Sequence, residues 1–276
     1  MIREIESYLK LPLSELTPDV IKKVSDSLTQ SRKQNFNHVG DDLDPELVKQ
    51  IKDLSEGRQI ESLSSWEEAQ LRELGFWRWV AFSGYNNLDP RCFPLHQRRH
   101  MLGAYSRTKW SVDRFANGNI VEIGCGPLGM ISHLSTRFAI GFDPLNKYYD
   151  ILFRKARGDT IEYVSDLAPV LEHKKEFFDF AICYNVLDHT ENPREIFDQY
   201  FSLIKPGGEF LLQVNIMDQT KPRSELHTRM HPSPMTVDQI SNWLNEYSEH
   251  YTTHLSDKLS PDNEYYFMAW GSKSES

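Results

Sequence analysis

The sequence contains little cysteine and no long apolar run. Its 276 residues include three cysteines, Cys92, Cys125 and Cys183, which form no CxxC pair. Thiols this sparse and scattered argue against a disulfide framework or a zinc site, and they suit a reducing compartment. No apolar stretch approaches the ~20 residues needed to cross a bilayer, and the amino terminus is charged where a signal peptide has its apolar core. We therefore expect a soluble, cytoplasmic protein with no membrane partner.

Positive charge is also scarce. Lysine and arginine total 31 against 40 acidic residues, which gives a formal charge of −9. An acidic surface repels nucleic-acid phosphates, so we expect no nucleic-acid partner. The hydrophobic share of 39% is ordinary for a folded protein and is sufficient for one large domain with an added cap.

The first part of the chain carries helix start signals, each ahead of apolar residues at helical spacing. These signals are Thr17-Pro18, Asp44-Pro45 and the capping-box pair Ser65 and Glu68. We expect the aromatic run 76–79 in the last of these helices to pack against the next domain. The turn signal Asn117-Gly118-Asn119 then predicts a boundary between a helical region, 1–115, and a second domain, 116–276.

The second domain alternates short β-rich runs with helical segments. The expected strands are 120–123, 138–142, 161–164, 180–184 and 210–214, followed by a helix at 237–247 and two more strands at 251–255 and 265–270. Such alternation predicts a doubly wound α/β fold, in which helices cover both faces of a mostly parallel sheet.

A glycine-rich turn follows the first expected strand, at residues 124–129. Glycines at three of these positions allow close backbone approach to a ligand, and the next helix would direct its first amides at that ligand. The GxGxxG pattern alone equally fits a nicotinamide or flavin enzyme, or a turn that binds nothing. Glu122 at the strand end can receive an ammonium group, and Pro127 removes an amide that a pyrophosphate would need. A cofactor with an ammonium and no phosphates therefore fits better than a dinucleotide.

Acidic residues end the next two strands. Asp143, about 20 residues beyond the glycine turn, suits the ribose hydroxyls of a nucleoside cofactor. Asp166, beside Leu167, can accept a hydrogen bond from an adenine amino group. It can equally cap the helix that follows, and the sequence leaves both interpretations open.

Four motifs together resemble the class I S-adenosylmethionine (SAM)-dependent methyltransferases. They are E-I-G-C-G-P-L-G, F-D-P, F-D-F-A-I-C-Y-N-V-L-D-H and L-I-K-P-G-G-E-F-L-L, from residue 122 to residue 212. Their order and spacing are those of the family, and the resemblance extends from about residue 119 to the carboxyl terminus. It implies a Rossmann-like sheet of seven strands whose last strand, near 265–270, runs antiparallel.

The resemblance also implies a SAM site. The glycine turn would hold the methionine part, with Glu122 near its amino group and Asn185 beside the reacting methyl. Asp143 would take the ribose, and Asp166 with Leu167 the adenine. The cofactor-binding residues implied in this way are Glu122, Gly124, Cys125, Gly126, Gly129, Asp143, Asp166, Leu167 and Asn185.

His189 is the leading candidate for a catalytic base. It lies just past the fourth strand, and an ordinary imidazole pKa of ~6.5 suits proton acceptance at neutral pH. A base matters for a hydroxyl acceptor and hardly at all for a carboxylate or a neutral amine. His189 could instead shape the loop or bind the cofactor.

Two basic clusters, 96–100 and 221–231, are expected to border the active site of this acidic protein. The candidate substrate-binding residues are Arg98, Arg99, Arg223, His227, Arg229 and His231. They could bind an anionic acceptor by charge-assisted hydrogen bonds, although salt bridges to the acidic helices are the simpler interpretation. His227 and His231 have HxxxH spacing, but a metal site would need a further ligand, so we predict no metal. Pro232 and Pro234 favour a loop here over a long helix.

The main functional hypothesis is therefore methylation of a small-molecule acceptor, such as a sugar or an anionic metabolite, on oxygen or nitrogen. A non-catalytic SAM-binding or interaction module is the second hypothesis. A nicotinamide oxidoreductase is the third, and it leaves Pro127 and the later motifs unexplained. The helices of 1–115 are expected to cap the acceptor site or to form a homodimer contact.

Overall fold

The computed structural model describes most of the chain from residue 43 onward. The described residues are 43–82, 103–104, 106–110, 113–154, 156–157, 159–218, 220, 225–256 and 264–275, without the side chains of 80–82 and 225–227. The predicted helix at Thr17-Pro18 and the candidates Arg98, Arg99 and Arg223 lie outside the described residues, as does the side chain of His227.

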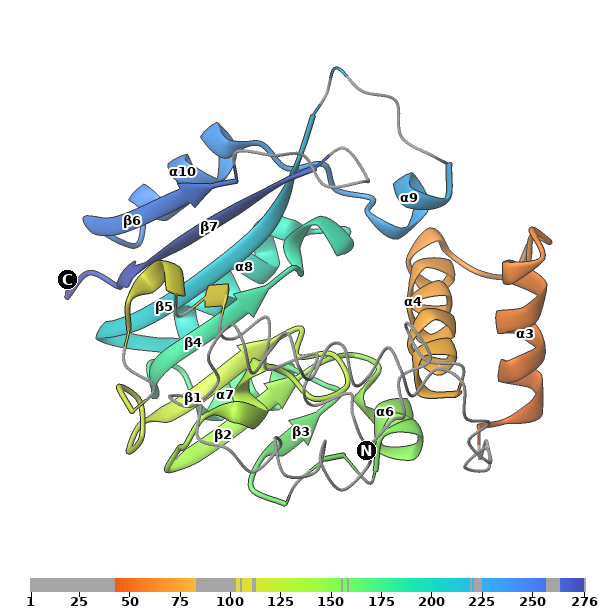
Figure 1. Cartoon of the computed structure of the whole chain (residues 1–276), viewed down its shortest axis with the longest axis horizontal. Coiled ribbons are helices and arrows are strands. Elements are labelled where there is room, and N and C mark those ends of the chain that lie inside the picture. The colour runs from red at the N-terminus through yellow and green to blue at the C-terminus, as the bar shows by residue number, and fades with distance from the viewer. Residues whose placement is uncertain are drawn as a thin grey trace.

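The centre of the molecule is a seven-stranded sheet in the order β3-β2-β1-β4-β5-β7-β6 (Figure 1). The strands are β1 (Asn119–Ile123), β2 (Phe138–Phe142), β3 (Glu162–Val164), β4 (Phe178–Tyr184), β5 (Ile204–Met217), β6 (His250–Leu255) and β7 (Glu264–Ser272). The first five pair in parallel, and β7 runs antiparallel to both β5 and β6. The predicted doubly wound sheet with an antiparallel last strand is thus confirmed.

The central strands are buried on both faces, as expected of a parallel sheet covered by helices. All five residues of β1 are buried, and its side chains alternate between two cores. Val121 and Ile123 pack on the face that holds Phe197 of α8 (Pro193–Leu203). Ile120 packs on the opposite face with Met130 of the 3₁₀ helix η3 (Met130–His133).

Strand β5 begins earlier than the sequence indicates. The segment 205–208, which precedes the expected strand 210–214, belongs to β5 itself, and Ile204 already pairs with Phe178. The register between β4 and β5 shifts between Phe178 and Phe180, and Gly207 has a φ of 71°. Residues 205–208 therefore make the start of β5 irregular without interrupting the strand.

The remaining helices lie on the faces of the sheet and beyond its carboxyl edge (Figure 1). They are α6 (Asn146–Leu152), α7 (Ala168–His173), η4 (Leu187–His189), α9 (Glu225–Met230) and α10 (Val237–Asn245). The Thr236 hydroxyl accepts a hydrogen bond from the Gln239 amide and caps α10, which lies where the sequence predicted a helix.

Helices α3 (Pro45–Ser55) and α4 (Ser65–Phe82) lie side by side at one end of the molecule (Figure 1). Asp44 caps α3 as predicted, because its carboxylate accepts from the Glu46 amide at 2.8 Å. The predicted capping box is wrong by one residue. Ser64 is the cap of α4, and it exchanges hydrogen bonds with Glu67.

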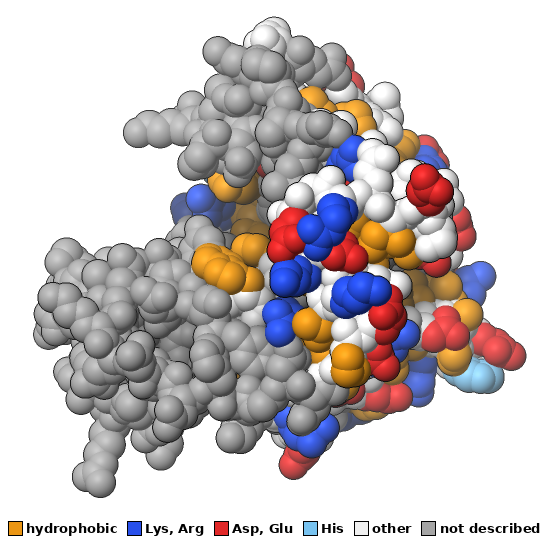
Figure 2. Space-filling view, turned by 90° about the vertical axis from the view of Figure 1, so that its right-hand side faces the viewer, with side chains coloured by type: hydrophobic (Ala, Val, Ile, Leu, Met, Phe, Trp, Pro, Cys, Tyr) orange, Lys and Arg blue, Asp and Glu red, His pale blue; other side chains and the backbone are white. Residues whose placement is uncertain are grey.

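The aromatic run of α4 packs against the sheet domain only in part. Trp77 contacts Tyr149 and Phe153 edge to face, with ring centroids 6.5 Å apart in both cases. Phe76 and Trp79 are 37% and 47% exposed. Figure 2 looks onto this side of the molecule, where hydrophobic, basic and acidic side chains are interspersed over the described surface.

Candidate functional site

The glycine-rich turn leaves the carboxyl end of β1 with all three glycines in the left-handed region. Their φ angles are 69° at Gly124, 58° at Gly126 and 73° at Gly129. A Cβ on Gly124 would lie 2.2 Å from Cγ2 of Val186, and one on Gly129 would lie 2.5 Å from Oε2 of Glu122. Both glycines are therefore required by backbone conformation and by space.

Glu122 is buried beneath this turn. Its carboxylate accepts hydrogen bonds from the Met130 amide at 3.0 Å and from the Ile131 amide at 2.8 Å. Burial raises the pKa of Glu122 to about 8, although the two amide hydrogen bonds act in the opposite direction. The first amides of the following helix were predicted to face a ligand. Those of Met130 and Ile131 instead bind Glu122, because a carboxylate buried this close to them must find donors.

Asp143 follows β2 and ties the next strand end to the glycine turn. Its carboxylate accepts from the Gly126 amide and from the Leu145 amide, both at 2.9 Å. Burial raises the pKa of Asp143 to about 6, against the effect of both amides. Asp143, the residue predicted to bind the ribose, is thus hydrogen-bonded directly to the glycine turn that is predicted to hold the methionine part of SAM.

Asp166 lies two residues past the end of β3 and is exposed, beside the buried Leu167. Asp166 Oδ1 accepts from the Ala168 amide at 2.9 Å, in the first turn of α7. The capping interpretation of Asp166 therefore has a hydrogen bond to support it. A contact with adenine stays a prediction.

Arg157 was not singled out in the sequence, yet it supports the glycine turn from behind. Its guanidinium donates to the carbonyl of Pro127 at 2.6 Å, to the carbonyl of Gly126 at 3.3 Å and to Oδ1 of Asn146 at 2.5 Å. It also lies over the ring of Tyr163, 3.9 Å from the ring centroid. No local pattern marks this arginine, because its partners lie on separate loops.

Asn185 and His189 lie past β4, the neighbour of β1 on the other side. Asn185 adopts a φ of 59°, and its Nδ2 lies 3.2 Å from Nε2 of His189. Asn185 is exposed and His189 is half-buried. Since β4 pairs with β1 in parallel, both side chains lie at the same sheet edge as the glycine turn.

His231 joins His189 from a distant segment. A loop was predicted for this stretch, but residues 225–230 form the short helix α9, which ends ahead of Pro232. The His231 ring lies 4.0 Å from that of His189, centroid to centroid, and its Nδ1 lies 2.7 Å from Oδ2 of the buried Asp188. Asp188 was missed in the sequence because its partner is 43 residues away.

Arg229 pairs with the amino-terminal helices. Its guanidinium donates to Oε1 of Glu68 at 2.8 Å, and the same carboxylate accepts from Arg72 at 2.7 Å. For this candidate the simpler interpretation, a salt bridge to an acidic helix, agrees with the geometry. Helix α4 therefore contacts both the glycine-turn side, through Trp77, and the segment that carries Arg229.

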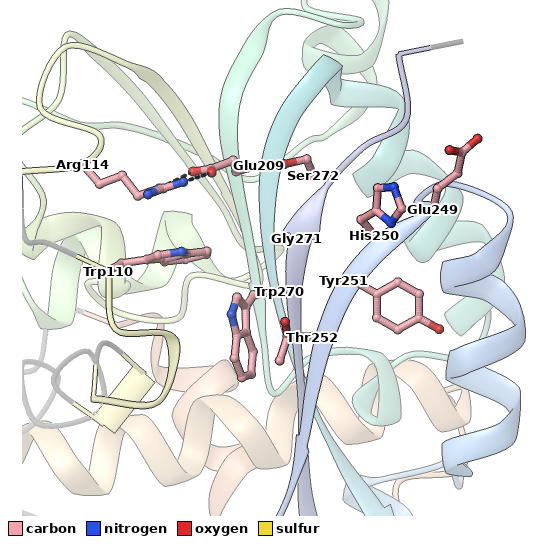
Figure 3. A pocket seen from close by; sticks show the side chains of 10 residues that line it. All are labelled: Trp110, Arg114, Glu209, Glu249, His250, Tyr251, Thr252, Trp270, Gly271 and Ser272. Carbon is pink, nitrogen blue, oxygen red and sulfur yellow. Dashed lines mark hydrogen bonds and ion pairs between the residues drawn. The ribbon is translucent and has the colours of Figure 1, made fainter.

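A separate hollow of about 430 Å³ lies along β6 and β7 (Figure 3). Trp110 and Trp270 line it, and the Arg114 guanidinium points at the carboxylate of Glu209 and donates to it. Glu209 pairs with Ser272 at the start of the regular part of β5, so the hollow lies at the amino edge of the parallel strands. The glycine turn, Asp143 and His189 all lie at the opposite, carboxyl edge.

The parallel sheet with an antiparallel β7, and the glycine turn at the carboxyl end of β1, define a class I SAM-dependent methyltransferase fold. Residues 95–259, more than half of the chain, match the family model described as "Methyltransferase domain". The chain belongs to this family, whose cofactor is SAM. The matched segment begins ahead of the predicted boundary at residue 116. None of the described helices has the length and apolar character needed to cross a membrane.

Curated relatives support the assignment. The chain is 27% identical over 109 residues to a ubiquinone biosynthesis O-methyltransferase of Shewanella sp. (strain ANA-3), covering 35% of this chain and 45% of the relative. It is 28% identical over 137 residues to the enzyme of the same name from Erwinia tasmaniensis, covering 45% of this chain and 52% of the relative. The chain thus spans about half the length of the curated relatives it matches.

Solved structures share the fold at low sequence identity. The phosphoethanolamine N-methyltransferase 2 of Haemonchus contortus in complex with SAM superposes with a TM-score of 0.55 at 14% identity, over 79% of this chain and 62% of that one. Its complex with phosphomonomethylethanolamine and S-adenosylhomocysteine gives 0.52 at 14% identity, over 75% of this chain and 58% of that one. Likeness at this identity shows the fold alone.

Proposed function

We propose that this protein transfers the methyl group of SAM to a hydroxyl oxygen of a small, anionic acceptor. One observation carries the proposal: the carboxyl ends of β2, β1 and β4, which are neighbours in the sheet, bring together Asp143, the glycine turn and His189. Ligands of doubly wound sheets bind at this edge.

The cofactor would lie across the ends of β1 and β2. The methionine part would contact the glycine turn, its ammonium would approach Glu122 and its ribose would approach Asp143. The raised pKa of Glu122 supports its role, because an ammonium beside it favours the charged carboxylate that burial disfavours. Contacts of Leu167 with adenine and of Asn185 with the methyl-bearing end of SAM belong to the same proposal.

A hydroxyl acceptor is supported by the imidazoles beyond β4. The sulfonium methyl is already activated, so the protein mainly aligns the acceptor for in-line attack. A hydroxyl must also lose its proton, and the half-buried His189 is the proposed proton acceptor. The O-methyltransferase names of the curated relatives agree with this choice. The other predicted basic residues, Arg98, Arg99, Arg223 and His227, remain the proposed source of attraction for an anionic group.

We assign the helices of the predicted region 1–115 to a cap over this site. Support comes from α4, which contacts α6 and α9 at the two sides of the site. Leu74 and Trp77 of α4 pack with Leu128 of the glycine turn, so the cap and the cofactor loop share one apolar cluster.

Calorimetric titration with SAM, S-adenosylhomocysteine and NAD tests the cofactor half. We expect micromolar binding of the first two and none of NAD. Asp143→Ala should weaken SAM binding about 100-fold, an effect of ~3 kcal/mol. Asp159→Ala, which removes an exposed carboxylate from a turn, is the matched control and should bind like the wild type.

Transfer from SAM carrying a labelled methyl group tests the acceptor half. The panel pairs each hydroxyl acceptor with its amine counterpart, with and without a carboxylate or phosphate. Methylation of anionic hydroxyl compounds supports the proposal. Transfer to amines alone contradicts the assignment to oxygen, and SAM binding without any transfer favours a non-catalytic SAM-binding module.

A further inference from the structure

Beside His189, hydrogen bonds join η4 to the segment that follows α9. The proposed chemistry gives these contacts no role. The His231 Nδ1 donates to the carboxylate of Asp188 at 2.7 Å. The Ser233 amide donates to the Asp188 carbonyl at 3.2 Å, and the Ser233 hydroxyl donates to the Thr190 carbonyl at 2.5 Å. Three hydrogen bonds over three residues hold the segment after α9 in one position against η4.

Asp188, His231 and His189 differ in burial, and the difference shows which of them a bound acceptor can reach. Asp188 is fully buried and His231 is 9% exposed, whereas His189 is half-buried and borders Asn185. Of the three, His189 is therefore the group that a bound acceptor can reach. Asp188 and His231 lie behind it.

The carboxylate of Asp188 accepts fewer hydrogen bonds than its two oxygens allow. Its Oδ2 meets His231, and its Oδ1 is buried with no partner among the described residues. Burial by itself would raise the pKa of Asp188, but the attraction of His189 and the hydrogen bond from His231 together hold it below the ordinary value. A buried anion of this kind would stabilise a positive charge that forms on an adjacent side chain during a reaction.

We infer that Asp188 and His231 are positioning residues that hold His189 in place and stabilise the imidazolium formed there during methyl transfer. The inference rests on the proposed function, in which His189 accepts the hydroxyl proton. Neither Asp188 nor His231 needs to touch the acceptor.

The step balances within this group. The acceptor O–H proton passes to a ring nitrogen of His189 while the oxygen attacks the methyl carbon. The new O–CH₃ bond forms as the S–CH₃ bond breaks, and the bonding pair stays on sulfur, which leaves neutral S-adenosylhomocysteine. The imidazolium charge is then balanced by Asp188, so the buried group changes from one negative charge to neutral as the reaction proceeds.

The same three side chains offer nitrogen and oxygen atoms within 4.8 Å of one another. A cation bound among them would occupy the carboxylate and the imidazole lone pairs that the inference needs. We therefore expect the transfer rate to be the same before and after exhaustive chelation. A rate that disappears with a chelator and returns with a divalent metal would overturn the inference.

The test compares methyl transfer to 3,4-dihydroxybenzoate, a small anionic hydroxyl acceptor, in five variants of the full chain. We expect kcat to fall about 100-fold in His189→Asn and in Asp188→Asn and about 10-fold in His231→Phe, with the KM for SAM unchanged within twofold. The double variant Asp188→Asn/His189→Asn should be no slower than His189→Asn, because without His189 no imidazolium remains to be stabilised. His231→Asn, whose amide nitrogen keeps a donor where the imidazole Nδ1 bonds Asp188, should recover part of the loss.

A second readout needs no turnover. Wild-type protein should show a far-downfield imidazole N–H proton resonance from the His231–Asp188 hydrogen bond, which Asp188→Asn and His231→Asn abolish and His189→Asn keeps. Glu191→Gln and His173→Asn, which alter exposed groups of the same kinds, are the matched controls. Wild-type protein that methylates no hydroxyl acceptor defeats the proposed function, and the inference falls with it. Active wild type with equally active Asp188→Asn, or multiplicative losses in the double variant, overturns the inference alone.

Discussion

The two sides of the proposed site, one for the cofactor and one for the acceptor, are built in different ways. On the cofactor side, each acid binds amides close to it in sequence: Glu122 reaches residues 130 and 131, and Asp143 reaches residues 126 and 145. On the acceptor side, Asp188 meets His231 across 43 residues, and Arg229 meets Glu68 across 161. Short-range hydrogen bonds define the cofactor loop, whereas chain folding assembles the acceptor side.

The two sides also treat charge differently. Burial raises the pKa values of Glu122 and Asp143, although backbone amides donate to both carboxylates. Asp188, equally buried, has a lowered pKa because imidazoles already face it. The two acids on the cofactor side are thus bonded to backbone amides, whereas the acid on the acceptor side faces imidazoles.

Gly124→Ala should have the largest effect, because this position joins the two sides. The new Cβ would overlap Val186, which separates Asn185 from the helix that carries His189, and alanine would be strained at a φ of 69°. We expect a loss of about 2 to 4 kcal/mol of folding free energy and at least a 10-fold loss of SAM affinity. Chemical denaturation and calorimetry measure the two quantities.

Gly207→Ala separates strain from overlap. Gly207 also has a positive φ, of 71°, but its Cβ would meet only ordinary contacts with Glu275, the shortest at 3.6 Å. We expect a loss of about 1 kcal/mol and unchanged SAM affinity. If the two variants behave alike, the contact between Gly124 and Val186 does not couple the two sides.

The sequence predicted most of the fold and the place of the glycine turn and Asp143 at neighbouring strand ends, and the reason is locality. A buried strand, a glycine turn and an acid at the next strand end are patterns of a few residues, so β1, β2 and β4 lie where they were expected. The errors concern the exact residues at which helices and strands begin. Ser64 caps α4 in place of Ser65, and Ile204 rather than a later residue begins β5.

The supports of the site could not be predicted in the same way. Arg157 binds the Gly126 and Pro127 carbonyls from 30 residues away, and no periodicity or motif marks an arginine that bonds to backbone. Asp188 was visible in the fourth motif, but its bond to His231 depends on how the segment after β5 returns to the sheet edge. Arg229 was considered as a substrate ligand, and its pairing with Glu68 appears only once α4 is placed beside α9.

Glu122→Gln should have the second largest effect, and it depends on pH. Glutamate ionises near 4.5 in the unfolded chain but only near 8 in the folded protein, so unfolding releases a proton between these values. The free energy of unfolding of the SAM-free protein should therefore fall as pH rises through this window, by about 2 kcal/mol between pH 6.5 and 8. Asp143, whose pKa rises to about 6, contributes the same sign below that range.

Glutamine cannot ionise, so Glu122→Gln should have a flat stability profile between pH 6.5 and 8.5 in urea denaturation. Saturating SAM should also flatten the wild-type profile, because its ammonium would stabilise the Glu122 carboxylate. A wild-type profile that is flat without SAM contradicts the buried, protonated state of Glu122. A profile that SAM leaves unchanged contradicts the ammonium contact.

The smallest expected effect distinguishes a salt bridge from a substrate contact on the acceptor side. The Arg229 and Glu68 side chains are 32% and 20% exposed, and Arg72 stays bonded to Glu68 when Arg229 is removed. Arg229→Gln should therefore cost only about 0.5 kcal/mol of stability, and a double-mutant cycle with Glu68→Gln should give a coupling energy of that size.

Acceptor kinetics complete this comparison, because the two interpretations of Arg229 predict opposite patterns. A salt bridge that only fastens α9 to α4 predicts equal, small changes in the acceptor KM for Arg229→Gln and Glu68→Gln. An arginine that binds an anionic acceptor predicts a KM raised about 10-fold by Arg229→Gln and lowered by Glu68→Gln, which releases the guanidinium from its competing carboxylate. We expect the first pattern. The second pattern would mean that Glu68 competes with the acceptor for Arg229, and that the cap takes part in selecting the acceptor.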